Sequence, residues 1–120
     1  TSGAVDELRT QVDALRGHCD AVGRRFEDIE LTCGCQPVIR STEAAARRAC
    51  LEMLERNRMP AAAAEDAVTR WVGTPELIAT RIRERAALGF TTFMAEIPAP
   101  FDPETMERLI GEVRPMVEAS

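Results

Sequence analysis

Four cysteines and one histidine are the side chains of this sequence with the clearest potential for metal chemistry. Cys33 and Cys35 are separated by one residue, and His18 is followed directly by Cys19. Zinc accepts thiolate and imidazole ligands, but its usual structural sites combine two ligand pairs at fixed spacing. One Cys-x-Cys pair does not supply that set. We therefore expect no metal site, and we predict that the thiols, Cys50 included, are reduced, buried and unreactive.

Phosphate chemistry is not indicated either. The segment at residues 72–74 has one glycine and lacks both the dinucleotide and the P-loop spacing. The net charge is −5, and the basic doublets Arg24-Arg25 and Arg47-Arg48 are isolated. Binding to nucleic acid requires a clustered excess of basic residues. We expect no nucleic-acid partner and interpret the doublets as solvated parts of helices.

Length and hydrophobicity limit the class of protein. A chain of 120 residues has room for one domain at most. No apolar run approaches the roughly 20 residues that cross a bilayer, so we expect no membrane association. The chain starts neither with a signal peptide nor with methionine, and its cysteines do not by themselves indicate secretion. The expectation is a cytoplasmic, trimmed chain.

Hydrophobic periodicity predicts the elements of the first half. Apolar residues from Val5 to Val22 recur at steps of three and four, which predicts a helix closed by Gly23. Residues 29–35 alternate apolar and small or polar side chains in the period of a strand. Ser41 is a suitable N-cap for a helix to about Asn57. A short alanine-rich helix should follow from residue 60, with Trp71 anchoring its end to the core.

The second half repeats the alternation of helix and strand. Thr74 and Pro75 predict a helix start, and Gly89 predicts its end before a strand at residues 90–97. The Pro98-Ala99-Pro100 segment ends that strand, and Asp102 begins a last helix. Pro115 should kink it. Its inward side is predicted to carry Met106, Leu109, Ile110, Val113 and Val117.

This order predicts an α/β fold whose two strands are parallel and joined by right-handed crossovers. Two parallel strands leave both outer edges unpaired and most of their faces uncovered. We therefore expect a single partial domain over residues 1–120. Its partner is expected to be either a missing N-terminal part of the same protein or a second copy of the chain.

Three segments resemble the C-terminal third of the luciferase-like monooxygenase superfamily, which includes flavin and deazaflavin-dependent oxidoreductases. They are LRGHCDAVG at 15–23, VGTPELIATRI at 72–82 with LGFTTF at 88–93, and DPETMERL at 102–109. The VGTPE start followed by an amphipathic helix, a glycine and a strand is the most specific of them. The resemblance implies the C-terminal fragment of a TIM (β/α)8 barrel, with residues 29–35 and 90–97 as its seventh and eighth strands.

Barrel enzymes bind substrates at the C-terminal ends of their strands, so the implied site lies beyond residue 35 and near residue 96. Strand alternation would turn Cys33, Cys35 and Phe93 outward onto helices. Gln36, Met94 and Glu96 would then face the barrel interior and the substrate. Both polar groups can hydrogen-bond a substrate, and Glu96 can also transfer a proton if desolvation raises its pKa. The alternative is that Glu96 only pairs with an arginine.

The resemblance also implies a cofactor in the intact parent, either FMN or the deazaflavin coenzyme F-420. The parent would transfer a hydride between the reduced cofactor and a small organic substrate. The family's cofactor contacts and acid/base residues lie mainly on earlier strands, so we expect no cofactor on this chain alone and assign no catalytic residue. Two alternatives stay open: a non-catalytic α/β module that self-associates through open strand edges, and a small thiol-metal protein.

Overall fold

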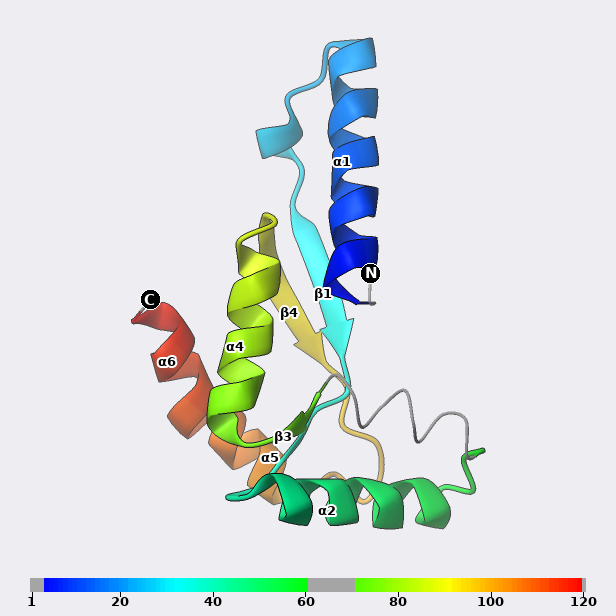
Figure 1. The fold of residues 1–120 in the computed structure, drawn as a ribbon, viewed down its shortest axis with the longest axis vertical. Coiled ribbons are helices and arrows are strands. Elements are labelled where there is room, and N and C mark those ends of the chain that lie inside the picture. Colours follow the sequence, from blue (N-terminus) through cyan, green and yellow to red (C-terminus); the bar gives the residue numbers. More distant parts are fainter. Residues whose placement is uncertain (1–3, 61–70, 120) are drawn as a thin grey trace.

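The computed structural model describes residues 4–60 and 71–119 of the chain (Figure 1). Their principal elements, in chain order, are α1 (Val5–Val22), β1 (Leu31–Cys35), β2 (Val38–Ile39), α2 (Glu43–Arg56), β3 (Val72–Gly73), α4 (Pro75–Ala86), β4 (Phe90–Ala95), α5 (Pro103–Arg108) and α6 (Arg114–Glu118). A 3-10 turn, Phe26–Asp28, precedes β1, and a π-helical turn, Leu109–Val113, joins α5 to α6. The alanine-rich helix predicted from residue 60 falls on residues 61–70, outside the described ranges.

Helix caps account for where the helices begin and end. Thr74 caps α4 by accepting a hydrogen bond from the backbone of Leu77, and Pro75 occupies the first turn, as predicted. Gly23 ends α1 with a φ of 74°, a left-handed conformation that glycine adopts at little cost. The predicted N-cap of α2 was wrong by one residue. Thr42, not Ser41, accepts the capping hydrogen bond from Ala45.

β1 and β4 pair in parallel, which confirms the predicted arrangement of the two main strands. Leu31 lies opposite Phe90, but Thr32 lies opposite Thr92, so Thr91 is an extra residue in β4. Both strands are shorter than predicted, since β1 begins at Leu31 and β4 ends at Ala95. Within the described residues, each of these strands has one hydrogen-bonded neighbour, which leaves its other edge unpaired.

A second parallel pair, β2 with β3, was not predicted. Val38 lies opposite Val72, and Ile39 lies opposite Gly73. Two residues per strand are too few to produce a readable alternation, so the sequence predicted only the two longer strands. The pair extends the chain beyond the C-terminal end of β1, and α2 packs against it.

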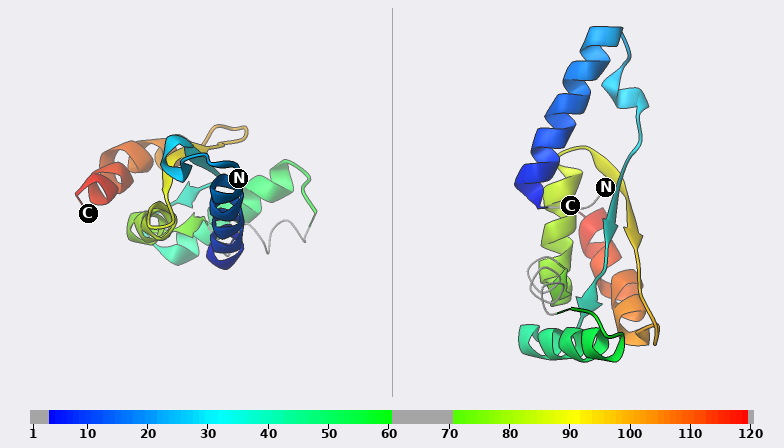
Figure 2. Two further views of the ribbon diagram at one scale, coloured as in Figure 1. Left: turned by 90° about the horizontal axis from the view of Figure 1, so that it is seen from above. Right: turned by 90° about the vertical axis from the view of Figure 1, so that its right-hand side faces the viewer.

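The main core lies between the β1–β4 pair and the helices on one of its faces. The right-hand view of Figure 2 shows α1 and α4 on the same side of these strands. The buried residues of this cluster come from α1, β1, β2, α4, β4 and the π turn, with Trp71: Leu8, Val12, Cys33, Cys35, Ile39, Trp71, Ile78, Ala79, Ile82, Phe90 and Val113. This burial explains the apolar stripes of α1 and α4.

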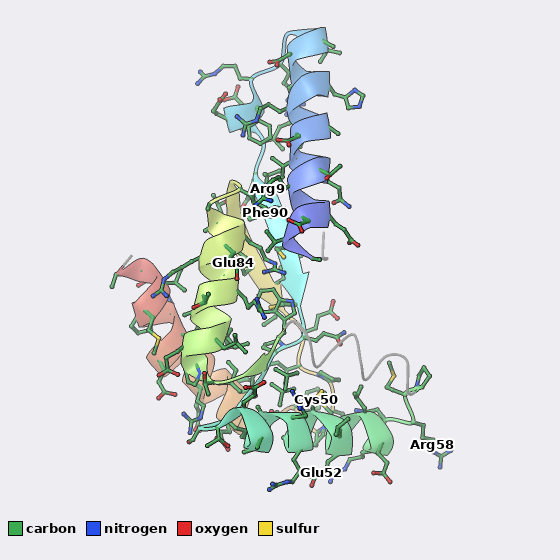
Figure 3. The ribbon with its side chains drawn as sticks, in the orientation of Figure 1. Arg9, Cys50, Glu52, Arg58, Glu84 and Phe90 are labelled. Atoms are coloured by element: carbon green, nitrogen blue, oxygen red, sulfur yellow. The ribbon has the colours of Figure 1, made fainter. Side chains whose placement is uncertain are left out.

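A smaller cluster lies between α2 and the β2–β3 pair. It contains Val38, Ala46, Cys50, Leu54 and Val72. Figure 3 shows the Cys50 side chain on the side of α2 that faces the strands, and Glu52 on the opposite side. The buried residues of α2 therefore pack against a strand pair that was not foreseen.

The last helix departs from the predicted pattern. Pro115 has no N–H to donate, and the chain accommodates it with the π turn Leu109–Val113 directly before α6. Because a π turn contains more residues than an α turn, it changes which side chains face the core. Val113 is buried, but Met106 and Ile110, predicted to face inward, are exposed, Ile110 by 65%. Within the described ranges, no helix is sufficiently long and apolar to cross a bilayer.

Candidate functional site

Gln36 and Glu96, the two polar groups predicted from strand-end position, lie side by side. The Gln36 amide Nε2 donates a hydrogen bond to Glu96 Oε2 at 3.1 Å. The backbone continues the β1–β4 pairing to this point, because Glu96 N donates to Cys35 O at 2.8 Å. Both side chains are exposed. The sequence predicted their common position but not the hydrogen bond between them.

Met94 lies on the same face of the sheet as this pair. In the register it is opposite Gly34, and its side chain is 53% exposed. On the other face, Cys33 is fully buried and Phe93 packs against the main core, as the alternation predicted. Ala95 alternates with Met94 in the same way but is exposed, because it lies at the end of β4. The face with Met94 is therefore the one that α1 and α4 leave uncovered.

The far end of that face is occupied by a second polar contact. Thr92 lies opposite Thr32 in the register, and its hydroxyl donates to Glu30 Oε1 at 2.5 Å. A carboxylate thus stands at each end of the uncovered face, Glu30 before β1 and Glu96 after β4. Between these ends lie Gly34 and Met94.

The four cysteines do not assemble a metal site within the described residues. All four are free thiols and are buried. Burial raises the pKa of Cys35 to about 12, with further contributions from the nearby Cys33 and Glu96, while Arg85 opposes the shift. Burial also raises the pKa of Cys33 and Cys50. Thiols with raised pKa values carry little thiolate at neutral pH, which makes them poor nucleophiles and metal ligands.

Trp71 is a structural residue of the core. It is 6% exposed, and the guanidinium of Arg85 lies over its ring with a distance of 4.8 Å to the centroid. Arg85 is itself 2% exposed and donates from NH1 to the carbonyl of Arg81 at 3.0 Å. A cation over an indole face is attractive, so the contact stabilises the junction between β3 and α4.

A buried polar cluster, which the sequence did not predict, joins β2 to the start of α5. Thr105 is fully buried, accepts from Ile39 N at 3.0 Å and donates to Asp102 Oδ2 at 2.6 Å. Arg40 NH1 donates to Asp102 Oδ2 at 3.0 Å, and Arg40 Nε lies 3.4 Å from Glu104 Oε1. The Asp-Pro helix start was the sequence signal, but it revealed only that Asp102 caps a helix.

This cluster also sets the ionisation of its carboxylate. Burial acts to raise the pKa of Asp102, but hydrogen bonds from Arg40 and Thr105 and the charge of Arg40 outweigh it. The pKa therefore lies below its usual value. A pocket of about 220 Å³ between α2 and residues 100–103 includes Arg40 and Asp102 in its wall. Because these two groups already satisfy each other, we assign the cluster a structural role.

No family model matches the sequence, and no curated protein matches it. Among solved structures, the chain is similar to riboflavin lyase RcaE, crystallised with modified FMN and the substrate riboflavin, with a TM-score of 0.73. The similarity covers 98% of this chain at 19% sequence identity but only 37% of the other chain. It supports the mixed α/β arrangement with parallel strands. The chain thus spans little more than a third of the length of that enzyme.

Proposed function

We propose that this chain is the C-terminal part of a luciferase-like, flavin-dependent oxidoreductase with a (β/α)8 barrel. One observation carries the proposal: almost the entire chain superposes on 37% of an enzyme crystallised with modified FMN, while the described residues leave one face of the β1–β4 pair uncovered. In a barrel, that face is the interior wall, and the two free strand edges are where the neighbouring strands join.

The positions of the strands in the chain agree with this role. β1 and β4 are parallel neighbours, as the seventh and eighth strands of a barrel would be, and α1 and α4 cover the opposite face as outer helices do. The three segments that resemble the luciferase-like superfamily fall on α1, on β3 to β4, and on α5. The order of these segments in the sequence and the arrangement of the elements in space support the same assignment.

Gln36, Glu96 and Met94 are proposed to form part of the substrate wall. They stand at the C-terminal ends of β1 and β4, the end at which barrel enzymes bind substrates. Gln36 and Glu96 would hydrogen-bond the substrate, and Met94 would contact its apolar part. The chain would close the barrel, while the residues that hold the cofactor would come from the rest of the protein. We assign no catalytic residue to this chain.

FMN is the proposed cofactor of the whole protein, with deazaflavin coenzyme F-420 as the alternative that the superfamily resemblance allows. The structural neighbour was crystallised with modified FMN, which gives no support to deazaflavin. The reaction would be hydride transfer between the reduced cofactor and a small organic substrate in the cytoplasm, without nucleic acid or membrane partners.

The mass of the natural protein that contains this sequence tests the proposal first. A barrel has roughly 250 residues, so a product of about that size or larger is expected. Titration of that protein with FMN and, separately, with F-420 should then give saturable binding of FMN. Binding of F-420 alone would change the cofactor, and binding of neither would remove the redox assignment.

The strand edges of β1 and β4 that no described residue pairs with favour one other candidate, an assembly module in which two copies pair their strands. This candidate predicts that the natural protein has a mass of 13.2 kDa, the mass of the chain, and elutes as a dimer. A product of barrel size would exclude it.

A further inference from the structure

The uncovered face of the β1–β4 pair has a gap in its row of side chains. Gly34 lies opposite Met94, and a Cβ built on Gly34 meets nothing within 4 Å. A glycine inside a strand often marks a place where a ligand approaches the backbone closely. The gap leaves half-buried backbone without a side chain over it, beside the polarisable side chain of Met94, and such a surface suits a planar ring.

The polar end of this strip mainly offers hydrogen-bond acceptors. Glu96 uses Oε2 to accept from Gln36, which leaves Oε1 as an acceptor. Gln36 retains its amide oxygen as an acceptor and one N–H as a donor. A ligand that uses this end fully must therefore bring several N–H or O–H groups.

The strip also carries two carboxylates that form no ion pair with a cation of the described residues. Within residues 4–60 and 71–119, no ion pair involves Glu96 or Glu30, the two carboxylates at its ends. Arg40, the next arginine after Gln36 in the chain, is held by Asp102 and Glu104. An anionic ligand would meet uncompensated repulsion here, whereas a cation would be attracted.

We infer that the strip formed by Gly34, Met94, Gln36 and Glu96 selects a planar ring that bears N–H or O–H donors and carries no negative charge. This inference rests on the proposed function, because the strip becomes an enclosed wall only in the complete barrel. It adds the substrate class, which the fold does not give.

Three ring compounds of nearly the same shape test the inference: benzamidine, benzamide and benzoate. Their binding to the natural full-length protein is measured by calorimetry, and the flavin content is measured in the same samples. Benzamidine and benzamide should bind at least about tenfold more tightly than benzoate, because donors and charge both favour them. Glu96→Gln should reduce the preference for benzamidine over benzoate by about tenfold, since it removes the charge and keeps the shape.

Two further variants test whether the binding preference comes from the strip rather than from the overall charge of the protein. Glu107→Gln removes an exposed carboxylate from α5, away from the strip, and should leave all three affinities unchanged. Gly34→Val places a side chain where the ring would lie, at a strand position that accepts valine well, and should weaken benzamidine and benzamide alike.

The outcomes are distinguishable. Flavin-containing protein that binds benzoate as tightly as benzamide, or that binds none of the three, overturns the inference and leaves the proposed function intact. Protein of barrel size that takes up neither flavin nor F-420 overturns the proposed function, and the inference with it. An equal response of Glu96→Gln and Glu107→Gln would show that the charge preference does not come from the strip.

Discussion

Replacing Thr105 with valine should destabilise the protein through a single buried hydroxyl. Thr105 is fully buried, and its Oγ1 accepts from Ile39 N at 3.0 Å and from Arg40 NH1 at 3.2 Å. The same oxygen donates to Asp102 Oδ2 at 2.6 Å. Valine has almost the same shape, so Thr105→Val removes these three contacts without creating a cavity.

The expected magnitude follows from the groups left behind. A buried backbone N–H without a partner costs about 1–3 kcal/mol, and Ile39 N would become such a group. Asp102 would lose one charge-assisted hydrogen bond but keep Arg40, so the total loss should be about 2–4 kcal/mol. Thr105→Ser is the matched control, because it keeps the hydroxyl and removes one methyl, at about 1 kcal/mol.

Urea unfolding measures both variants in the protein that contains this chain. The fluorescence of Trp71 reports the transition in this segment, since it is the chain's one tryptophan and it is buried. The free energy of unfolding should fall more for Thr105→Val than for Thr105→Ser by at least about 1 kcal/mol. Equal losses in the two variants would refute the hydrogen-bond reasoning and indicate that packing alone matters at this position.

Three other predictions concern ionisation and close packing, and the last of them has a matched control. The pKa of Asp102 lies below the usual 3.8, so its stabilising effect is complete above that value and is lost as the pH falls through the folded-state pKa; Asp102→Asn should therefore flatten the acid limb of stability measured by urea unfolding. Cys35, with a pKa of about 12, should react with a thiol reagent at about pH 8 far more slowly in the native state than in denaturant, and equal rates would contradict its burial. Gly73→Ala would push a Cβ into the Leu77 side chain and should cost about 1–3 kcal/mol in thermal or urea unfolding. Gly17→Ala, where the added Cβ meets nothing, should instead stabilise α1 by up to about 1 kcal/mol.

Local signals in the sequence were sufficient to predict most of the helices. Thr74 with Pro75, Asp102 with Pro103, and Gly23 each act through contacts within a few residues, and the structure has all three caps. The parallel pairing of the two main strands followed from the same local information, because helices alternate with strands along the chain.

Features that depend on distant contacts were not predictable in this way. Thr105 bonds to Ile39 across 66 positions of the chain, and nothing near either residue in the sequence indicates the other. Val22 was placed on the inward stripe of α1 but is 77% exposed, because α1 extends past the strands at that end (Figure 1). Ile110 is exposed since the π turn breaks the helical period on which its prediction depended.

In the candidate site, too, the local features could be predicted from the sequence and the distant contacts could not. Alternation along the strands predicted that Gln36, Met94 and Glu96 would share a face, and they do. The roles of these residues toward a substrate stay a prediction, because the rest of the proposed barrel would have to complete the site. The gap at Gly34 could be recognised only when the register placed it opposite Met94.

The extra residue in β4 decides on which side of the sheet Glu96 stands. Phe90 and Phe93 are an odd number of positions apart, yet both contact the core, which is possible only because Thr91 is left out of the pairing. A chain of equal length that flattened this bulge would turn Phe93 to the open side and Glu96 toward the helices. The position of Glu96 on the open side of the sheet therefore depends on Thr91, a residue that does not itself contact Glu96's partner Gln36.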